Sequence, residues 1–153
     1  MIERERRFLV PEVPSELPVP YRIVQGYLTT NPAAVRVRRR DDDYFLTIKT
    51  GSGLARHEIE RQLAADEFEA LWAVADSLRI EKRRYVLALS SGHTAELDLF
   101  DGDLAGRRIV EVEFDDDDSA EAFVPPDWFG REVTDDGRYT NAALATNGWP
   151  DDD

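Results

Sequence analysis

Charged residues recur at every second position in several segments of this chain, and most of these segments carry charges of one sign. Glu3 and Glu5 show this spacing near the start, and Arg36 and Arg38 repeat it with the opposite sign. In an extended strand, residues two positions apart lie on the same face. The spacing therefore predicts a mainly β chain whose strands each present one charged face.

Eight segments alternate with period two and are candidate strands. They are Ile2–Val10, Tyr21–Thr29, Ala34–Arg40, Tyr44–Thr50, Arg56–Leu63, Leu78–Leu89, Thr94–Phe100 and Arg107–Phe114. Turn signals separate them, and one of these, Gly51-Ser52-Gly53, lacks the Lys-Ser/Thr of a phosphate-binding P-loop. Short strands joined by tight turns predict an antiparallel barrel or sandwich.

Three helices are expected beside the strands. Asp66 can cap the first helix, whose apolar residues recur at helical spacing as Phe68, Leu71, Trp72 and Ala75. A second helix follows Ser119 and must end before Pro125, and a third covers Tyr139–Ala145. With no internal repeat and no linker, we expect one domain over residues 1–150 and an acidic tail over 151–153.

The formal net charge of the 153 residues is -13, from 32 acidic and 19 basic side chains. Twelve aspartates lie in runs at predicted turns and in the tail: Asp41–Asp43, Asp115–Asp118, Asp135–Asp136 and Asp151–Asp153. Without them, 20 acids face 19 bases. The charge argues against nucleic acid as a partner, but it does not exclude a small anion that enters with cations.

Several other classes are excluded by composition. The chain has no cysteine, so it has no disulfide and no thiolate metal site. No stretch approaches the ~18 apolar residues of a membrane span, and Met1-Ile2 leads into a charged run instead of a signal-peptide core. We expect a cytoplasmic protein with no membrane partner.

Paired carboxylates on one strand face suggest a role for cations. Such carboxylates lie about 7 Å apart and repel by about 2.4 kcal/mol at an effective dielectric of 20. The further acidic pairs are Glu58/Glu60, Glu96/Asp98 and Glu111/Glu113, and the second basic pair is Lys82/Arg84. Mg²⁺ or Mn²⁺ suits the carboxylates and a phosphate chain suits the bases. In a closed barrel the charged faces would line a polar tunnel; the alternative is a sheet with a wet outer face.

The ordered motifs resemble one family. Glu3-Arg4-Glu5-Arg6-Arg7 resembles the N-terminal ExExK signature of the CYTH superfamily, the triphosphate tunnel metalloenzymes. Further matches follow at Gln25–Leu28, Val35–Arg38, Leu46–Lys49, Arg56–Glu60, Glu81–Tyr85, Glu96–Asp98, Val110–Phe114, Pro125–Gly130 and Arg138–Tyr139. The resemblance covers nearly the whole chain. Arg7 departs from the signature lysine, and Arg4 replaces a residue that is usually apolar and should point away from the tunnel.

The resemblance implies an α+β, mainly β fold: an eight-stranded antiparallel closed β-barrel, the triphosphate tunnel, with a few outer helices. It implies binding of a small triphosphate with Mg²⁺ or Mn²⁺, and the short bacterial members imply hydrolysis of tripolyphosphate. Three alternatives remain: thiamine-triphosphatase activity, class IV adenylyl cyclase activity, and a non-catalytic polyphosphate-binding module. Trp128 and Trp149 either cover the barrel or form a homodimer contact.

The resemblance and the charge pairs together assign candidate site residues. The expected phosphate ligands are Arg7, Arg36, Arg38, Lys49, Arg56 and Arg84. The expected metal ligands are Glu3, Glu5, Glu60, Asp98, Glu111 and Glu113, with Glu96 as a further candidate. By resemblance, Lys82 lies near the scissile phosphate and assists water attack or the leaving group. Glu58 would face outward if its strand contains a bulge.

Overall fold

The computed structural model describes residues 1–51 and 53–151. Ser52, Asp152 and Asp153 lie outside the described residues, so the middle of the predicted Gly51–Gly53 turn and most of the predicted acidic tail do as well.

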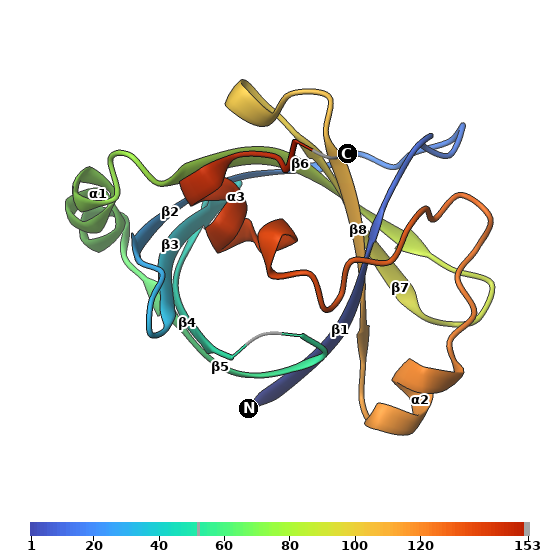
Figure 1. Cartoon of the computed structure of the whole chain (residues 1–153). Coiled ribbons are helices and arrows are strands. Elements are labelled where there is room, and N and C mark those ends of the chain that lie inside the picture. Colours follow the sequence, from blue (N-terminus) through green and yellow to red (C-terminus); the bar gives the residue numbers. More distant parts are fainter. Residues whose placement is uncertain (52, 152–153) are drawn as a thin grey trace.

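Eight antiparallel strands form a closed barrel (Figure 1). They are β1 (Ile2–Leu9), β2 (Tyr21–Thr29), β3 (Ala34–Arg40), β4 (Asp43–Thr50), β5 (Ala55–Leu63), β6 (Arg79–Ala88), β7 (Thr94–Phe100) and β8 (Arg108–Phe114). Around the barrel the order is β1-β5-β4-β3-β2-β6-β7-β8, and β8 pairs with β1. The predicted closed barrel is confirmed, and each predicted strand end lies within one residue of the observed end.

The three predicted helices are present, but their starts differ from the predictions. They are α1 (Ala65–Val74), α2 (Asp117–Ala122) and α3 (Asn141–Asn147). Ala64, rather than Asp66, is the N-cap of α1, and its N–H donates to Glu67 Oε1 at 2.8 Å. The α2 helix begins before Ser119, because Asp116 caps it. Tyr139 belongs to a 3₁₀ turn, Gly137–Tyr139, ahead of α3.

Two helices pack on opposite outer sides of the barrel (Figure 1). Phe68 of α1 is buried and contacts Tyr44 and Trp72, with ring centroids 5.0 and 5.4 Å away. On the other side, the α2 region covers an apolar cluster that includes Phe8 and Phe114. The outward residues of the alternating strands are therefore buried where helices or loops cover them.

An apolar cluster fills one end of the barrel interior. Its buried members are Ile80, Phe100, Leu104, Ile109, Val133, Tyr139 and Leu144. Ile80 and Phe100 lie on the same strand faces as Lys82 and Asp98, since they are two positions away. The 3₁₀ turn and α3 thus close this end, and the rest of the interior is left to polar side chains.

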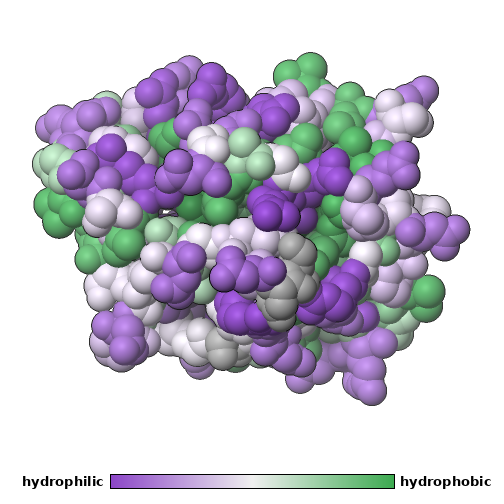
Figure 2. All heavy atoms as spheres, turned by 45° about the horizontal axis from the view of Figure 1, so that its top comes forward, coloured by the Kyte–Doolittle hydropathy of each residue, from purple (hydrophilic) through white to green (hydrophobic). Residues whose placement is uncertain are grey.

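Much of the aspartate-rich surface lies away from the barrel interior. Asp41 and Asp42 are exposed at the turn between β3 and β4, and Asp115–Asp118 are exposed at the end of β8 and the start of α2. Hydrophilic groups spread over much of the face in Figure 2, with hydrophobic residues between them. No helix in the described part of the chain has the length and apolarity needed to cross a membrane.

Candidate functional site

The interior charges separate by sign around the barrel circumference. We call the adjacent strands β7, β8, β1 and β5 the acidic arc and the adjacent strands β4, β3, β2 and β6 the basic arc. The inward acids of the acidic arc are Glu96, Asp98, Glu111, Glu113, Glu3, Glu5, Glu58 and Glu60. The inward bases of the basic arc are Lys49, Arg36, Arg38, Arg40, Lys82 and Arg84. The two arcs face each other across the interior.

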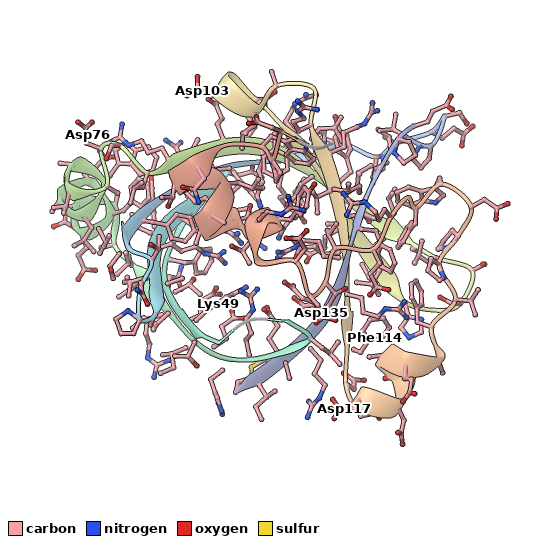
Figure 3. All side chains as sticks on the ribbon, in the orientation of Figure 1. Lys49, Asp76, Asp103, Phe114, Asp117 and Asp135 are labelled. Atoms are coloured by element: carbon pink, nitrogen blue, oxygen red, sulfur yellow. The ribbon has the colours of Figure 1, made fainter. Side chains whose placement is uncertain are left out.

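Alternation along β1 explains why these side chains point inward. Glu3, Glu5 and Arg7 share the inner face, while Arg4 points outward and pairs with Asp117 of α2 at 2.7 Å. The predicted outward direction of Arg4 is confirmed. Figure 3 shows the same contrast elsewhere, because Lys49 points into the ring while Asp76 and Asp103 lie outside it.

Three carboxylates of the acidic arc meet closely enough to share one cation. One oxygen from each of Glu3, Glu5 and Glu113 lies within 4.8 Å of the others. Glu5 and Glu113 stand directly opposite each other on β1 and β8, where like charges repel. Burial, with the nearby Glu111 carboxylate, raises the pKa of Glu5 to about 8. Burial and neighbouring carboxylates also raise the pKa of Glu113 to about 7.

Glu58 joins this cluster from β5, so the outward direction that a bulge would have caused does not occur. No bulge interrupts the β4–β5 register, and Glu58 pairs directly with Lys49. Burial and a hydrogen bond with Glu3 raise the pKa of Glu58 to about 7. Burial tends to raise the pKa of Glu3. The hydrogen bond with Glu58 and the Lys49 ammonium outweigh burial and lower this pKa to about 2. Lys49 Nζ lies 2.9 Å from Glu3 Oε1.

Two arginines lie within the acidic arc and bind its carboxylates. Arg7 Nη2 and Arg56 Nη2 lie 2.9 and 3.0 Å from Glu5 Oε1. Arg7 also donates to the backbone oxygen of Tyr139 at 3.1 Å. Burial opposes ionisation of Glu111, but the Arg7 charge keeps the pKa of Glu111 well below its ordinary value. Arg7 and Arg56 therefore offset part of the crowded negative charge.

Lys82 is buried at the boundary between the basic and acidic arcs. Its side chain has 0% exposure, and Nζ lies 2.7 Å from Asp98 Oδ2. Nζ also donates to Asn141 Oδ1, at the start of α3, over 3.2 Å. Burial lowers the pKa of Lys82 to about 7, against the opposing effect of Asp98. Arg84 donates to both Asp98 carboxylate oxygens, at 2.8 and 2.9 Å, so each of these oxygens contacts a cation.

Arg36 and Arg38 of β3 differ from the inward cations that bind carboxylates. Among the described residues, neither Arg36 nor Arg38 has an ion pair with a carboxylate, and Arg36 Nε has no hydrogen-bond partner. Arg38 instead donates from Nε and Nη2 to Gln25 Oε1, at 2.9 and 2.7 Å. Burial and the charges of Arg36 and Arg84 lower the pKa of Arg38 to about 9. These guanidinium groups can accept an anion without first releasing a carboxylate.

The interior contains two adjoining cavities that share Arg36, Lys49 and Asn141 in their walls. The first, of about 200 Å³, lies between the acidic and basic arcs. The second, of about 180 Å³, is lined by cations without a carboxylate among the described residues: Arg7, Arg36, Lys49 and Arg56. The two adjoining cavities together suit an elongated anion. One part of the anion would lie beside the carboxylates, which could bind a cation, and the rest would contact basic side chains.

The structure brings the sequence-predicted site residues together in one interior. Glu60 lies at an exposed position and accepts a hydrogen bond from Thr47 at 3.0 Å. The predicted roles in metal and phosphate binding stay predictions. Sequence reasoning did not single out Gln25 or Asn141: Gln25 appeared only within a motif, and Asn141 reaches the interior through the docking of α3, which no local signal marks.

The CYTH domain family model matches residues 1–136. The chain belongs to the CYTH domain family. It is 48% identical over 149 residues to the inorganic triphosphatase of Nitrosomonas europaea, a match that covers 95% of this chain and 97% of that protein. It is 40% identical over 126 residues to the inorganic triphosphatase of Acetivibrio thermocellus, over 80% of this chain and 79% of that protein.

Solved structures show the same barrel. The crystal structure of the inorganic triphosphatase NE1496 matches with a TM-score of 0.71 and 44% identity, covering 94% of this chain and 93% of that chain. A conserved Pyrococcus furiosus protein shares the fold at a TM-score of 0.56 and 19% identity, covering 78% and 83% of the two chains.

Proposed function

We propose that this protein hydrolyses inorganic triphosphate inside its barrel with the help of a divalent metal ion. The observation that carries this proposal is the opposition of the acidic and basic arcs across one interior. Phosphoryl transfer depends mainly on positioning and on neutralising charge. One wall with bases for phosphate and a facing wall with carboxylates for its cation would meet both needs. The relatives named inorganic triphosphatase support the same assignment.

In this proposal the basic arc binds the phosphates. Arg36 and Arg38 lack carboxylate partners among the described residues and can donate to phosphate oxygens in pairs. Lys49 and Arg84 stand where the basic arc meets the acidic arc, and each is already near a carboxylate. Arg7 and Arg56 line the cavity without carboxylates and would contact one end of the substrate.

Glu3, Glu5 and Glu113 are our candidates to hold the metal ion. Their oxygen atoms approach one another, and the raised pKa values of Glu5 and Glu113 indicate crowding that a cation would relieve. Oxygen-only ligands suit Mg²⁺ or Mn²⁺. When bound, such an ion would neutralise phosphate charge and acidify water. Asp98 is a weaker metal candidate than the sequence implied, because Lys82 and Arg84 already bind its oxygens.

Lys82 is our candidate for proton transfer. Its amine is buried, held by Asp98 and Asn141, and its lowered pKa of about 7 allows a neutral fraction near physiological pH. A neutral amine can take a proton from attacking water, and the ammonium form can stabilise the leaving phosphate.

Phosphate release from tripolyphosphate tests the proposal directly. We expect release with Mg²⁺ or Mn²⁺ and none with chelator. ATP and thiamine triphosphate, assayed in parallel, should be hydrolysed more slowly, and no cyclic AMP should form from ATP. A protein that binds tripolyphosphate without turnover under either metal would instead be a polyphosphate-binding module.

A further inference from the structure

Gln25 is a buried neutral side chain among the cations of the basic arc. The side chain is 0% exposed, on the inner face of β2 and directly opposite Arg38 on β3. Both hydrogen bonds from Arg38 converge on Gln25 Oε1, at 2.9 and 2.7 Å. The amide therefore receives the guanidinium as one oxygen of a carboxylate would, but it adds no charge.

Five other interior cations are held differently. Arg7, Arg56 and Arg84 each lie within 3.0 Å of a carboxylate oxygen, and so do Lys49 and Lys82. A carboxylate partner fixes a cation but offsets its charge, so an incoming phosphate must compete with it. At Arg38 the partner is neutral, and the full positive charge remains available.

The orientation of the Gln25 amide is itself fixed. Gln25 Nε2 donates to the hydroxyl of Tyr27 at 3.3 Å, and Tyr27 is buried two residues along the same strand face. This contact directs the amide oxygen toward Arg38. Two of the five guanidinium N–H groups of Arg38 are then used by Gln25, and Nη1 keeps both of its own for another acceptor.

We propose that Gln25 is a positioning residue for the triphosphate substrate: it holds Arg38 in the interior through a neutral amide, so that the guanidinium stays ordered and uncompensated for phosphate binding. The inference rests on the proposed function, because it assigns Gln25 a role in binding that same substrate. Arg38 lines the cavity between the arcs, and Gln25 is not among the described residues that line either cavity.

Two substitutions separate charge from hydrogen bonding. Gln25→Glu keeps the shape and the acceptor oxygen but supplies a counter-charge to Arg38. Gln25→Met keeps the approximate volume but removes the acceptor. We expect Gln25→Glu to weaken tripolyphosphate binding, because the new carboxylate would compete with phosphate for Arg38. The expected loss is roughly 10- to 100-fold, the range for losing hydrogen bonds between Arg38 and the charged phosphate. Gln25→Met should cost about 3- to 10-fold, because only the order of Arg38 is lost.

A merely structural role predicts the reverse ranking. If Gln25 only maintained the barrel, the glutamate variant would keep its bonds and bind like wild type, while the methionine variant would be the weaker binder. We expect the Gln25→Glu protein to have a Tm no lower than that of wild type, since it gains an ion pair. We expect its defect to appear in KM and Kd more than in kcat. Asn147→Asp is the charge control: it adds one negative charge at the exposed last residue of α3, and we expect a change within about twofold.

The experiment measures tripolyphosphate binding by calorimetry and phosphate release with Mn²⁺ for wild type and the three variants. Binding by Gln25→Glu equal to wild type, or weaker binding by Gln25→Met than by Gln25→Glu, overturns the role of Gln25 and leaves the proposed function intact. Wild-type protein that neither binds nor hydrolyses tripolyphosphate overturns the proposed function, and this inference with it.

Discussion

Lys82 combines complete burial with a lowered pKa of about 7, and these properties define its expected behaviour on substitution. We predict that Lys82→Ala lowers kcat for tripolyphosphate about 100- to 10,000-fold, the usual range for losing a proton-transfer group, with a smaller change in KM. Steady-state phosphate release measures both. Arg83→Ala is the control, since Arg83 is the next residue of β6 and pairs outward with Asp101. Full activity of Lys82→Ala would remove Lys82 from the chemistry.

The crowded glutamates predict how stability depends on pH in the metal-free protein. The pKa of Glu5 is raised to about 8 and the pKa values of Glu58 and Glu113 to about 7. Between pH 5 and 7 the folded chain therefore binds more protons than the unfolded chain, so the free energy of unfolding falls as pH rises. For Glu5 the slope reaches at most about 1.4 kcal/mol per pH unit. Lys82 has the opposite sign, but only above about pH 7.

Urea unfolding in chelator at several pH values between 5 and 7 measures this slope. We expect Mn²⁺ to reduce it, because a bound cation favours the ionised carboxylates. Glu113→Gln should also reduce it, since the neutral amide removes one of the crowded charges. A stability that stays constant across this range in chelator would contradict the crowding of these carboxylates.

At the scale of elements, the packing of α1 on the barrel depends on a glycine. A Cβ atom at Gly26 of β2 would lie 2.7 Å from Ala75 Cβ and 3.1 Å from the Trp72 ring. We predict that Gly26→Ala destabilises the protein by about 1–3 kcal/mol, because overpacking moves α1 off the strands. Denaturant unfolding measures the change. Gly137→Ala is the control, since a Cβ there meets nothing within 4 Å, and equal stability of the two variants would refute the close approach.

The elements also show where sequence reasoning succeeds and where it stops. The alternation of charged and apolar residues predicts the strand ends well, because successive side chains of a strand point to opposite faces of the sheet. The start of α1 was missed because Glu67, further along the helix, supplies the cap contact to Ala64. Glu58 was placed by strand register, and Asn141 by the docking of α3, and both depend on partners distant in sequence. Alternation alone contains no information about such partners.

At the scale of the whole molecule, a net charge of -13 coexists with a balanced interior. Among the described residues, the eight inward acids of the acidic arc are matched in number by eight inward bases: the six of the basic arc, and Arg7 and Arg56 within the acidic arc. The excess negative charge is therefore on the exterior. A bare triphosphate is repelled at long range, whereas its complex with a divalent cation is repelled less.

This arrangement predicts that metal and substrate stabilise the protein together. In Lys82→Ala, which should bind without turnover, tripolyphosphate with Mn²⁺ should raise Tm by more than the sum of the two separate effects. Ligand at 100 times its Kd stabilises by about 2.7 kcal/mol. Differential scanning fluorimetry over a matrix of both concentrations measures the effect. Strictly additive shifts would indicate that the two ligands bind independently.

The ring closes through a short seam between β1 and β5, where the register pairs are Ile2 with His57, Glu3 with Arg56 and Arg4 with Ala55. For most of its length β1 instead pairs with β8, the last strand along the chain. Folding must therefore bring distant parts of the chain together before the ring is complete, which slows the search. Opening the seam would separate Glu3 from Arg56 and Lys49 and admit water to the charged interior. We expect amide hydrogens along this seam to exchange fastest among those of the barrel, and the binding of metal at Glu3 to slow them.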